Sequence, residues 1–215
     1  IISTIVLFLG ILLTAQPGTL DITFPSNGSF KDQGFFLDSL DSETSVVNDA
    51  ILLPDGNFLV CGFKDNGSNY DFMVAKYLPN GLLDPDFGMN GVAIAGFGSA
   101  SDEGNALAVQ DDGKIIVAGT TKEEMEHSDF ALARFLPDGT LDNTFDADGK
   151  VTTEIETTGD FAKDVAIQVD GKIVVAGYCG QNFDYKFALA RYNTDGSLDN
   201  TFNSDGKLAH IINPG

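Results

Sequence analysis

The chain has 215 residues and is strongly acidic, with 12 Lys and Arg residues against 32 Asp and Glu residues and a formal net charge of −20. Binding to a nucleic-acid backbone draws on Lys and Arg side chains that release counterions, so we expect no nucleic-acid partner. Anionic membrane surfaces are disfavoured for the same reason, and the acidity itself is explained by solubility.

The chain begins with a nearly unbroken apolar run over residues 1–13. The run is too short to span a bilayer comfortably, and the small residue Ala15 that follows it suits a cleavage site. We therefore predict a signal peptide over residues 1–15, truncated at its start because neither Met nor a basic segment precedes it. A buried strand or a partner-facing helix is the alternative. The signal peptide implies a secreted or cell-surface protein, with no membrane insertion of the mature chain.

Three sequence motifs recur at one period along the rest of the chain. The first is a pair of apolar runs around Asp-Gly, which is typical of a two-residue hairpin turn with positive φ at both central residues. Its turn glycines are 57 and 58 residues apart, and the other two motifs keep step with them. A fixed period this long indicates a propeller or a solenoid. The copies are Gly56, Gly113 and Gly171 for the first motif; 71–77, 129–135 and 186–192 for the second; and 83–87, 141–145 and 198–202, with an early copy at 20–24, for the third.

Each repeat unit is predicted to contain four short strands joined by turns. In the second copy, the second strand is apolar at every position of Ile115–Ala118, which indicates cover on both faces, as in stacked sheets. The third strand alternates, with Phe130, Leu132 and Arg134 on one face. Four antiparallel strands without helical periodicity describe a propeller blade. The predicted strands of this copy are 105–110, 114–120, 129–136 and 150–156.

We predict an all-β chain of β-propeller-type repeats with four-stranded antiparallel blades. The array is incomplete, with about three blades and one N-terminal strand near 29–37, which falls short of the four to eight blades of closed propellers. We therefore expect an open arc with one exposed apolar blade face, which favours further blades or self-association. The predicted units are a partial N-terminal repeat at 16–44 and three blades at 45–99, 100–157 and 158–215.

The repeated motifs resemble those of a known family. Leu198–Phe202, the segment Asp170–Gly177 and the segment Phe187–Tyr192 look like the delta-60 repeat. This resemblance covers roughly residues 18–208, and the first copy departs from it with Pro85-Asp86 in place of Asn-Thr. It implies a propeller fold and a place in large secreted or surface-attached bacterial proteins. The family has no established catalytic residues, so the resemblance implies no chemistry.

Two acidic turns are the only candidates for a metal site. They resemble half of a calcium loop, and their candidate ligands are Asp146 and Asp148 in one turn and Asn203 and Asp205 in the other. Calcium takes six to eight oxygen ligands, and neither turn has the downstream Glu of an EF-hand loop. We therefore favour ordinary Asp-Gly or Asn-Gly turns and expect no cofactor, with calcium as the alternative.

A row of cations in the third strand has a matching row of acids. Lys76, Arg134 and Arg191 share one register, and an aspartate lies eight residues after each of them. We hypothesise that each cation pairs with an acid of its own or the neighbouring blade, which would make the pairs structural. A ligand-binding row of cations is the alternative. The aspartates are Asp84, Asp142 and Asp199.

The remaining reactive side chains show no pattern of a nucleophilic enzyme. Cys61 and Cys179 lie at different registers, so we expect each to pack as a small apolar residue without a bridge. His127 is on an acidic loop that we expect to be solvated, and His210 has no counterpart in the other copies. The segment Gly96–Ser99 has the spacing of neither a nucleophile elbow nor a dinucleotide loop.

These observations favour a non-enzymatic secreted or cell-surface module that acts as a binding or structural scaffold. Loops 64–70, 121–128 and 180–185 differ among the copies while the strands hold, and recognition usually resides in such loops. The expected partner is a protein or a glycan. The alternative is a propeller-fold hydrolase or lyase that acts on extracellular polysaccharide or lactone at the blade axis, an idea that depends on fold analogy alone.

Overall fold

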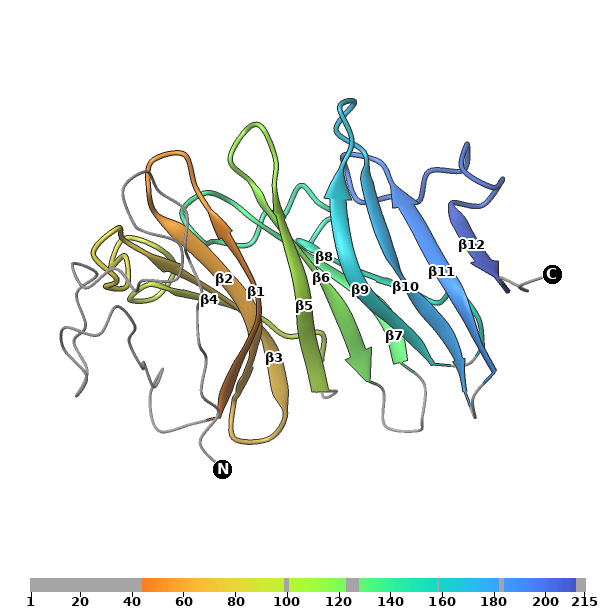
Figure 1. The fold of residues 1–215 in the computed structure, drawn as a ribbon, viewed down its shortest axis with the longest axis horizontal. Helices are drawn as coiled ribbons and strands as arrows, with labels where there is room; N and C mark the ends of the chain where they lie inside the picture. The colour runs from red at the N-terminus through yellow and green to blue at the C-terminus, as the bar shows by residue number, and fades with distance from the viewer. Residues whose placement is uncertain (1–43, 99–100, 123–127, 158, 182–183, 212–215) are drawn as a thin grey trace, which may run out of the picture.

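The computed structural model describes residues 44–98, 101–122, 128–157, 159–181 and 184–211 (Figure 1). The predicted signal peptide, the predicted strand near 29–37 and His127 lie outside these residues. The described residues form strands, bridges and turns, and this part of the chain has no helix with the length and apolar character needed to cross a membrane.

Twelve strands form three four-stranded antiparallel sheets, and in each sheet the strands are ordered as in the sequence. This architecture confirms the predicted all-β fold with four-stranded blades. We refer to the sheets as blades 1, 2 and 3. Blade 1 contains β1 (Ser45–Leu52), β2 (Phe58–Asp65), β3 (Tyr70–Tyr77) and β4 (Val92–Ala95); blade 2 contains β5 (Ser101–Val109), β6 (Ile115–Lys122), β7 (Ser128–Phe135) and β8 (Lys150–Thr153); blade 3 contains β9 (Asp160–Ile167), β10 (Ile173–Gln181), β11 (Asp184–Tyr192) and β12 (Lys207–His210).

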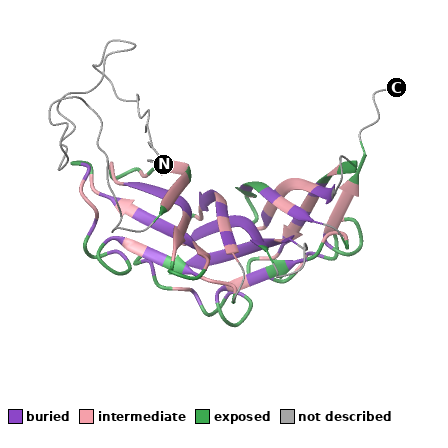
Figure 2. Cartoon of the chain, turned by 90° about the horizontal axis from the view of Figure 1, so that it is seen from below, coloured by how far each residue is buried: buried purple, intermediate pink, exposed green. Residues whose placement is uncertain are grey.

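The blades stack face to face into an open arc. The first strands β1, β5 and β9 lie side by side (Figure 1), so β5 lies against blade 1 and β9 lies against blade 2. Blades 1 and 3 lie at the two ends of the arc and do not meet (Figure 2). The sheets are therefore not closed into a ring, as the sequence predicted.

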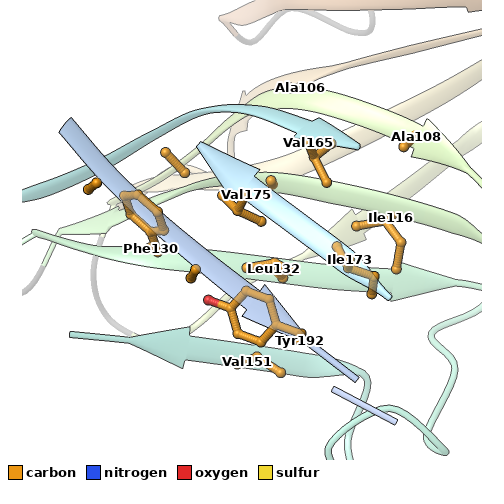
Figure 3. Packing of buried hydrophobic residues seen from close by; sticks show 14 of the residues in the cluster. Ala106, Ala108, Ile116, Phe130, Leu132, Val151, Val165, Ile173, Val175 and Tyr192 are labelled. Atoms are coloured by element: carbon orange, nitrogen blue, oxygen red, sulfur yellow. The ribbon is translucent and has the colours of Figure 1, made fainter. Parts of the chain in front are cut away.

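The hydrophobic core consists of two layers between the blades. One layer lies between blades 1 and 2 and the other lies between blades 2 and 3 (Figure 3). Blade 2 contributes to both layers because Phe130 and Leu132 face blade 3 whereas Ala131 and Ala133 face blade 1. All four residues of Ile115–Ala118 are buried, which confirms the cover predicted for both faces of this strand.

A bulge in the first strand of each blade explains the glycine that ends the apolar run of the second strand. The pairing register shifts in β1, β5 and β9 opposite Gly62, Gly119 and Gly177. A Cβ atom on Gly119 would lie 2.0 Å from the carbonyl oxygen of Glu103, so no larger residue fits there. The bulged strand therefore requires glycine at this position.

The hairpin between the first and second strands differs from the predicted two-residue turn. In blade 2 the Gln110 N–H donates to the Lys114 carbonyl, and the Gly113 N–H donates to the Gln110 carbonyl, which closes a three-residue loop. Only the glycine has positive φ, at 82°, and the Asp112 carboxylate accepts the Lys114 N–H at 3.2 Å. This is a turn followed by a left-handed glycine, a common hairpin connection. The prediction of positive φ at both central residues was wrong because the aspartate side chain stabilises an ordinary turn conformation.

The faces at the two ends of the arc differ in exposure. The side of blade 1 away from blade 2 holds a third buried cluster that includes Phe58, Met73 and Tyr77. The side of blade 3 away from blade 2 exposes large apolar side chains, with Phe187 60% exposed and Tyr185 52% exposed. The predicted exposed apolar blade face is therefore present, and it lies on blade 3.

Candidate functional site

The cation row predicted from the sequence forms ion pairs within each blade. In blade 2, Arg134 Nε lies 2.8 Å from Asp142 Oδ2, and both side chains are only 4% exposed. The same guanidinium donates from Nη2 to Thr144 Oγ1 at 3.0 Å and from Nη1 to the carbonyl of Thr194 in blade 3. Its carbon Cζ lies 4.5 Å from the centre of the Phe145 ring. Arg134 thus fixes the turn after β7 and holds it against the next blade.

The equivalent pairs in blades 1 and 3 are simpler. Lys76 Nζ lies 2.9 Å from Asp84 Oδ2, and Arg191 Nε lies 2.7 Å from Asp199 Oδ2. A second cation joins the aspartate in blade 3, where Lys172 of the Asp-Gly-Lys turn lies 2.9 Å from Asp199. These contacts confirm the hypothesis of structural pairs and connect two of the repeated sequence motifs, the hairpin lysine and the turn aspartate.

The paired aspartates are held in their ionised form. Burial alone would raise the pKa of Asp142, but hydrogen bonds from Thr144 and the charges of Arg134 and Lys114 hold that pKa below its ordinary value. The hydrogen bond from Lys172 is the main reason that the pKa of Asp199 is lowered. Carboxylates that stay ionised in fixed ion pairs are poor proton donors at neutral pH. The cation row therefore serves the structure of the blade.

The acidic turns hold their polar groups in local hydrogen bonds. Asp148 Oδ1 and Asp205 Oδ1 each accept the backbone N–H two residues later at 3.0 Å, and Asn203 Nδ2 donates to the Lys207 carbonyl at 2.6 Å. Asp146 has positive φ, at 46°, and its backbone N–H donates to the Asp195 carbonyl of blade 3 at 2.8 Å. The four calcium candidates thus lie in two separate turns whose hydrogen bonds fix the backbone and contact the next blade.

Two buried aspartates that the sequence reasoning missed lie at the starts of β5 and β9. Asp102 Oδ2 accepts the Phe97 N–H at 2.8 Å, and Asp160 Oδ2 accepts the Ile155 N–H at 2.6 Å. Both side chains are fully buried. Each carboxylate thereby fixes the connection that arrives from the preceding blade. Their shared position, 58 residues apart, was the only signal that could have identified them.

Burial changes the acidity of these two aspartates. It raises the pKa of Asp160 to about 6, and the charges of Asp129 and Glu154 act in the same direction, whereas the hydrogen bonds from Ile155 and Glu156 oppose it. The pKa of Asp102 is also raised, mainly by burial. Perturbed carboxylates can mark catalytic sites, but these two bind backbone N–H groups and have a structural role in the fold.

Side chains on the first strands connect neighbouring blades directly. Asn48 Nδ2 donates to the Gly104 carbonyl at 2.8 Å, and Asn105 Nδ2 donates to the Ala162 carbonyl at 2.8 Å. Asp49 Oδ2 accepts the Leu107 N–H at 2.9 Å. At the other edge of the blades, Lys150 and Lys207 donate from Nζ to carbonyls of the preceding connection, at 3.0 Å in both cases. The polar contacts between blades thus repeat from one interface to the next.

The described cysteines and histidine form no reactive cluster. Cys61 and Cys179 are free and buried, and burial raises the pKa of the Cys179 thiol to about 11, so the thiolate is scarce at neutral pH. His210 is exposed on β12. Within the described ranges, no group of three or more His, Cys, Asp or Glu side chains is arranged to hold a metal ion.

The connections between the second and third strands lie at one end of the blades. The β2–β3, β6–β7 and β10–β11 connections are at the same rim of the arc (Figure 1). In blade 1 this loop is built on side chains, because Asn66 Nδ2 donates to Asp71 Oδ2 at 2.8 Å and Asp65 Oδ1 accepts the Gly67 N–H at 2.8 Å. The segments whose sequences differ most among the copies are therefore collected on one rim.

Comparison with family models gives three matches, one in each blade. Residues 53–87, 110–145 and 168–202 match a model described as "Domain of unknown function (DUF5122) beta-propeller". Each match runs from the first hairpin turn to the phenylalanine of the third motif, so it contains the ion pair and the second and third strands. No curated protein matches the chain.

Proposed function

The chain belongs to the DUF5122 β-propeller family, a domain family of unknown function, and from this premise we propose that it is a non-enzymatic extracellular repeat module that binds a protein or a glycan through one rim. The family match agrees with the resemblance to the delta-60 repeat. The observation that carries the proposal is a division of labour within each blade. The repeated polar residues hold the blades together, and the variable residues lie on the connections at one rim.

The repeated polar residues support a module without catalysis. Arg134 and Asp142 bind each other in the buried interior, and Asp102 and Asp160 accept backbone N–H groups. Side chains whose hydrogen bonds are already used within the fold are not available for substrate. The described candidates for acid, base and metal chemistry thus have structural partners.

The variable rim supports a binding role. The loop after β2 has the sequence Asn66-Gly67-Ser68-Asn69, and it is ordered by hydrogen bonds of its own side chains. Ser68 is exposed at the tip of this loop. Loops that differ in sequence on a constant framework are the usual location of recognition in repeat proteins.

The extracellular location and the choice of partner are parts of the same proposal. The apolar run over residues 1–13 suits a secretion signal, and two free cysteines are compatible with a fold that is stabilised by its core. The net charge of −20 disfavours nucleic acid and acidic polymers as ligands. Neutral polysaccharides and basic or neutral proteins remain as partners.

Affinity electrophoresis of the full chain in gels that contain soluble xylan, glucomannan or dextran tests the proposal. We expect retardation by at least one of these polymers and no release of reducing ends. Ser68→Arg should remove the retardation, because the added side chain blocks the rim. Asn143→Arg is the matched control, since Asn143 is exposed on the turn after β7, at the opposite end of the blade.

The alternative, a hydrolase or lyase of polysaccharide or lactone, predicts a different result. Purified chain would then release reducing ends or open a lactone, and the activity would survive Ser68→Arg. Catalytic turnover by the purified chain would overturn the proposal. Retardation that Ser68→Arg and Asn143→Arg weaken equally would place the binding surface away from this rim.

A further inference from the structure

The side of blade 3 that faces away from blade 2 forms one continuous apolar surface. The strand pairing places Phe161, Tyr178 and Phe187 in one row across the sheet, and Ala176 and Leu189 in the next row. Phe161 stacks on Tyr178 with ring centres 4.9 Å apart, and Tyr178 meets Tyr185 edge to face at 5.3 Å. We call these six residues the open face: Phe161, Ala176, Tyr178, Tyr185, Phe187 and Leu189.

The same positions in blades 1 and 2 are covered by the next blade. Phe72 and Phe130, the counterparts of Phe187, are fully buried, whereas Phe187 is 60% exposed. Blade 1 even has the same aromatic pair, because Phe63 and Tyr70 correspond to Tyr178 and Tyr185 and lie 5.0 Å apart. The open face thus has the apolar composition of the two interfaces inside the arc.

The polar groups of the open face also match those interfaces. Arg191 forms the ion pair with Asp199 and donates to Thr201 Oγ1 at 3.2 Å, as Arg134 does with its own aspartate and threonine. Arg134 has one more contact, the carbonyl of Thr194 in the next blade. Among the described residues Arg191 has no such carbonyl, and its side chain is 22% exposed against 4% for Arg134.

Asp164 repeats the position of a second acceptor at the blade interface. Asp49 accepts the Ala50 N–H with Oδ1 and the Leu107 N–H of blade 2 with Oδ2. Asp164 accepts the Val165 N–H with Oδ1 in the same way. The side chain is exposed, and in the described part of the chain no N–H of a following strand reaches it. The open face therefore presents one donor and one acceptor at the places where a next blade would meet them.

We propose that the open face of blade 3 is a docking surface for a further blade of the same repeat, seated as blade 3 is seated on blade 2. The surface matches a turn carbonyl opposite Arg191 and a strand N–H opposite Asp164. A blade presents these two groups on the side that faces the preceding blade, as Thr194 and Leu107 show. The surface also needs apolar contact over the aromatic row, which that side of a blade supplies.

A second copy of the chain fits this surface less well. Two open faces set against each other would each lack the turn carbonyl and the strand N–H that the other needs. The opposite end of the arc is also closed to such a copy, since Phe58 and Tyr77 on the outer side of blade 1 are 3% and 6% exposed. The occupant is therefore a further blade joined through a short connection, like residues 96–100 and 154–159. The inference does not depend on the proposed binding function.

The test compares the full chain with a chain in which residues 159–211 follow Gly215 a second time, which keeps the repeat spacing. We expect both proteins to be monomers by light scattering. In the extended chain, backbone amides of β11 in the original blade 3 should exchange at least about tenfold more slowly than in the parent. Phe187→Asp should leave the fold of the parent intact, because the side chain is exposed, and should remove the added protection from the extended chain.

Val169→Asp is the matched control, since Val169 is fully exposed on the turn before β10 and lies outside the open face. It should leave the protection of the extended chain unchanged. Unprotected β11 amides in the extended chain would overturn the proposal. A parent chain that dimerises, and becomes monomeric with Phe187→Asp, would also overturn it and would identify a second copy as the occupant.

Discussion

Arg134 shows how one side chain connects three levels of the fold. Its guanidinium holds the aspartate of its own turn, a threonine hydroxyl of the same turn and a carbonyl of the next blade. The Phe145 ring covers it, so the charge has little access to water. A buried cation of this kind is tolerated only because its donors are satisfied, and removal of one partner leaves the other charge uncompensated.

We predict that Arg134→Ala lowers the free energy of unfolding by about 3–5 kcal/mol, because Asp142 is left as a buried carboxylate with only the more distant Lys114. Arg191→Ala should cost less than about 2 kcal/mol, since Arg191 is partly exposed and Lys172 remains beside Asp199. Urea unfolding followed by circular dichroism measures both values. Equal losses for the two variants would contradict the role given to the contact with the next blade.

Asp160 affects stability in the opposite direction. Its pKa of about 6 in the folded chain lies above the ordinary value of 3.8, so folding favours the protonated form. The stability that this group withholds at neutral pH is recovered as the pH falls through 6 toward 4. The lowered pKa values of Asp84, Asp142 and Asp199 act below about pH 4, where protonation of these carboxylates weakens the ion pairs.

We therefore predict that the free energy of unfolding rises by about 1–3 kcal/mol between pH 7.5 and pH 5 and falls again below about pH 4. Asp160→Asn should flatten the rise, because the amide oxygen still accepts the N–H groups of Ile155 and Glu156 while the titrating charge is gone. Chemical unfolding at a series of pH values tests this. The net charge of −20 adds a general rise on acidification in both proteins, so the difference between them is the informative quantity.

At the level of the element, the bulged first strand and the glycine of the second strand form one unit. Gly62, Gly119 and Gly177 each face a backbone carbonyl of the bulge, and a Cβ atom at these positions would lie 1.8–2.0 Å from that oxygen. The glycine is therefore required by the neighbouring strand, and its own strand could accept a larger residue. The bulge in turn directs Asn48 and Asn105 toward the next blade.

We predict that Gly119→Ala costs about 3 kcal/mol or more, because the backbone of β5 must move to admit the methyl group. Gly67→Ala is the control, since nothing lies within 4 Å of a Cβ atom there and only the positive φ of 92° opposes it, at about 1 kcal/mol. Thermal unfolding of the two variants gives the comparison. A Gly119→Ala variant as stable as Gly67→Ala would show that the bulge adapts freely.

The periodic spacing of the motifs was sufficient to predict the strands, their order and the stacked arrangement. Continuous apolar runs such as Ile115–Ala118 have a direct physical meaning, cover on both faces, and the structure bears it out. The hairpin turn could not be predicted correctly, because Asp-Gly suits two turn types and the hydrogen bond from Lys114 to Asp112 decides between them. Neither could the bulge be predicted, since an extra residue in one strand leaves no trace in the apolar pattern.

At the scale of the whole molecule, stability is shared between the blades and the contacts between neighbours, as in other repeat arrays. Blade 2 has a blade on each side, and the side chains of β7 that face them are buried in two separate core layers. Blade 3 has a neighbour on one side in the described part of the chain and exposes the open face on the other. The middle of the arc is therefore its most stable part.

Hydrogen exchange should reveal this gradient. We predict that amides of β6 and β7 exchange at least about tenfold more slowly than those of β10 and β11, because opening of blade 2 disrupts two core layers and opening of blade 3 disrupts one. Exchange followed by mass spectrometry on the native chain measures the ratio. Uniform protection of the two blades would indicate a single cooperative unit.

The cation–aspartate pairs could be predicted from the sequence because both partners recur with a fixed separation of eight residues. The buried aspartates at the starts of β5 and β9 could not, because their partners are backbone N–H groups, which carry no sequence signal. Arg134 and Thr194 lie 60 residues apart in neighbouring blades, so their contact depends on the stacking geometry. Interactions within one unit were thus readable, and interactions between units required the structure.

Because each interface is built from the same contacts, the gene can change length without harm only in steps of a whole period. An unequal crossover between two copies that adds or deletes one period would still leave an N–H like that of Gly88 opposite a carbonyl like that of Asp138. A deletion of a few codons inside a period would instead displace every later motif from its counterpart. Natural length variants of this protein should accordingly differ by multiples of 57 or 58 residues.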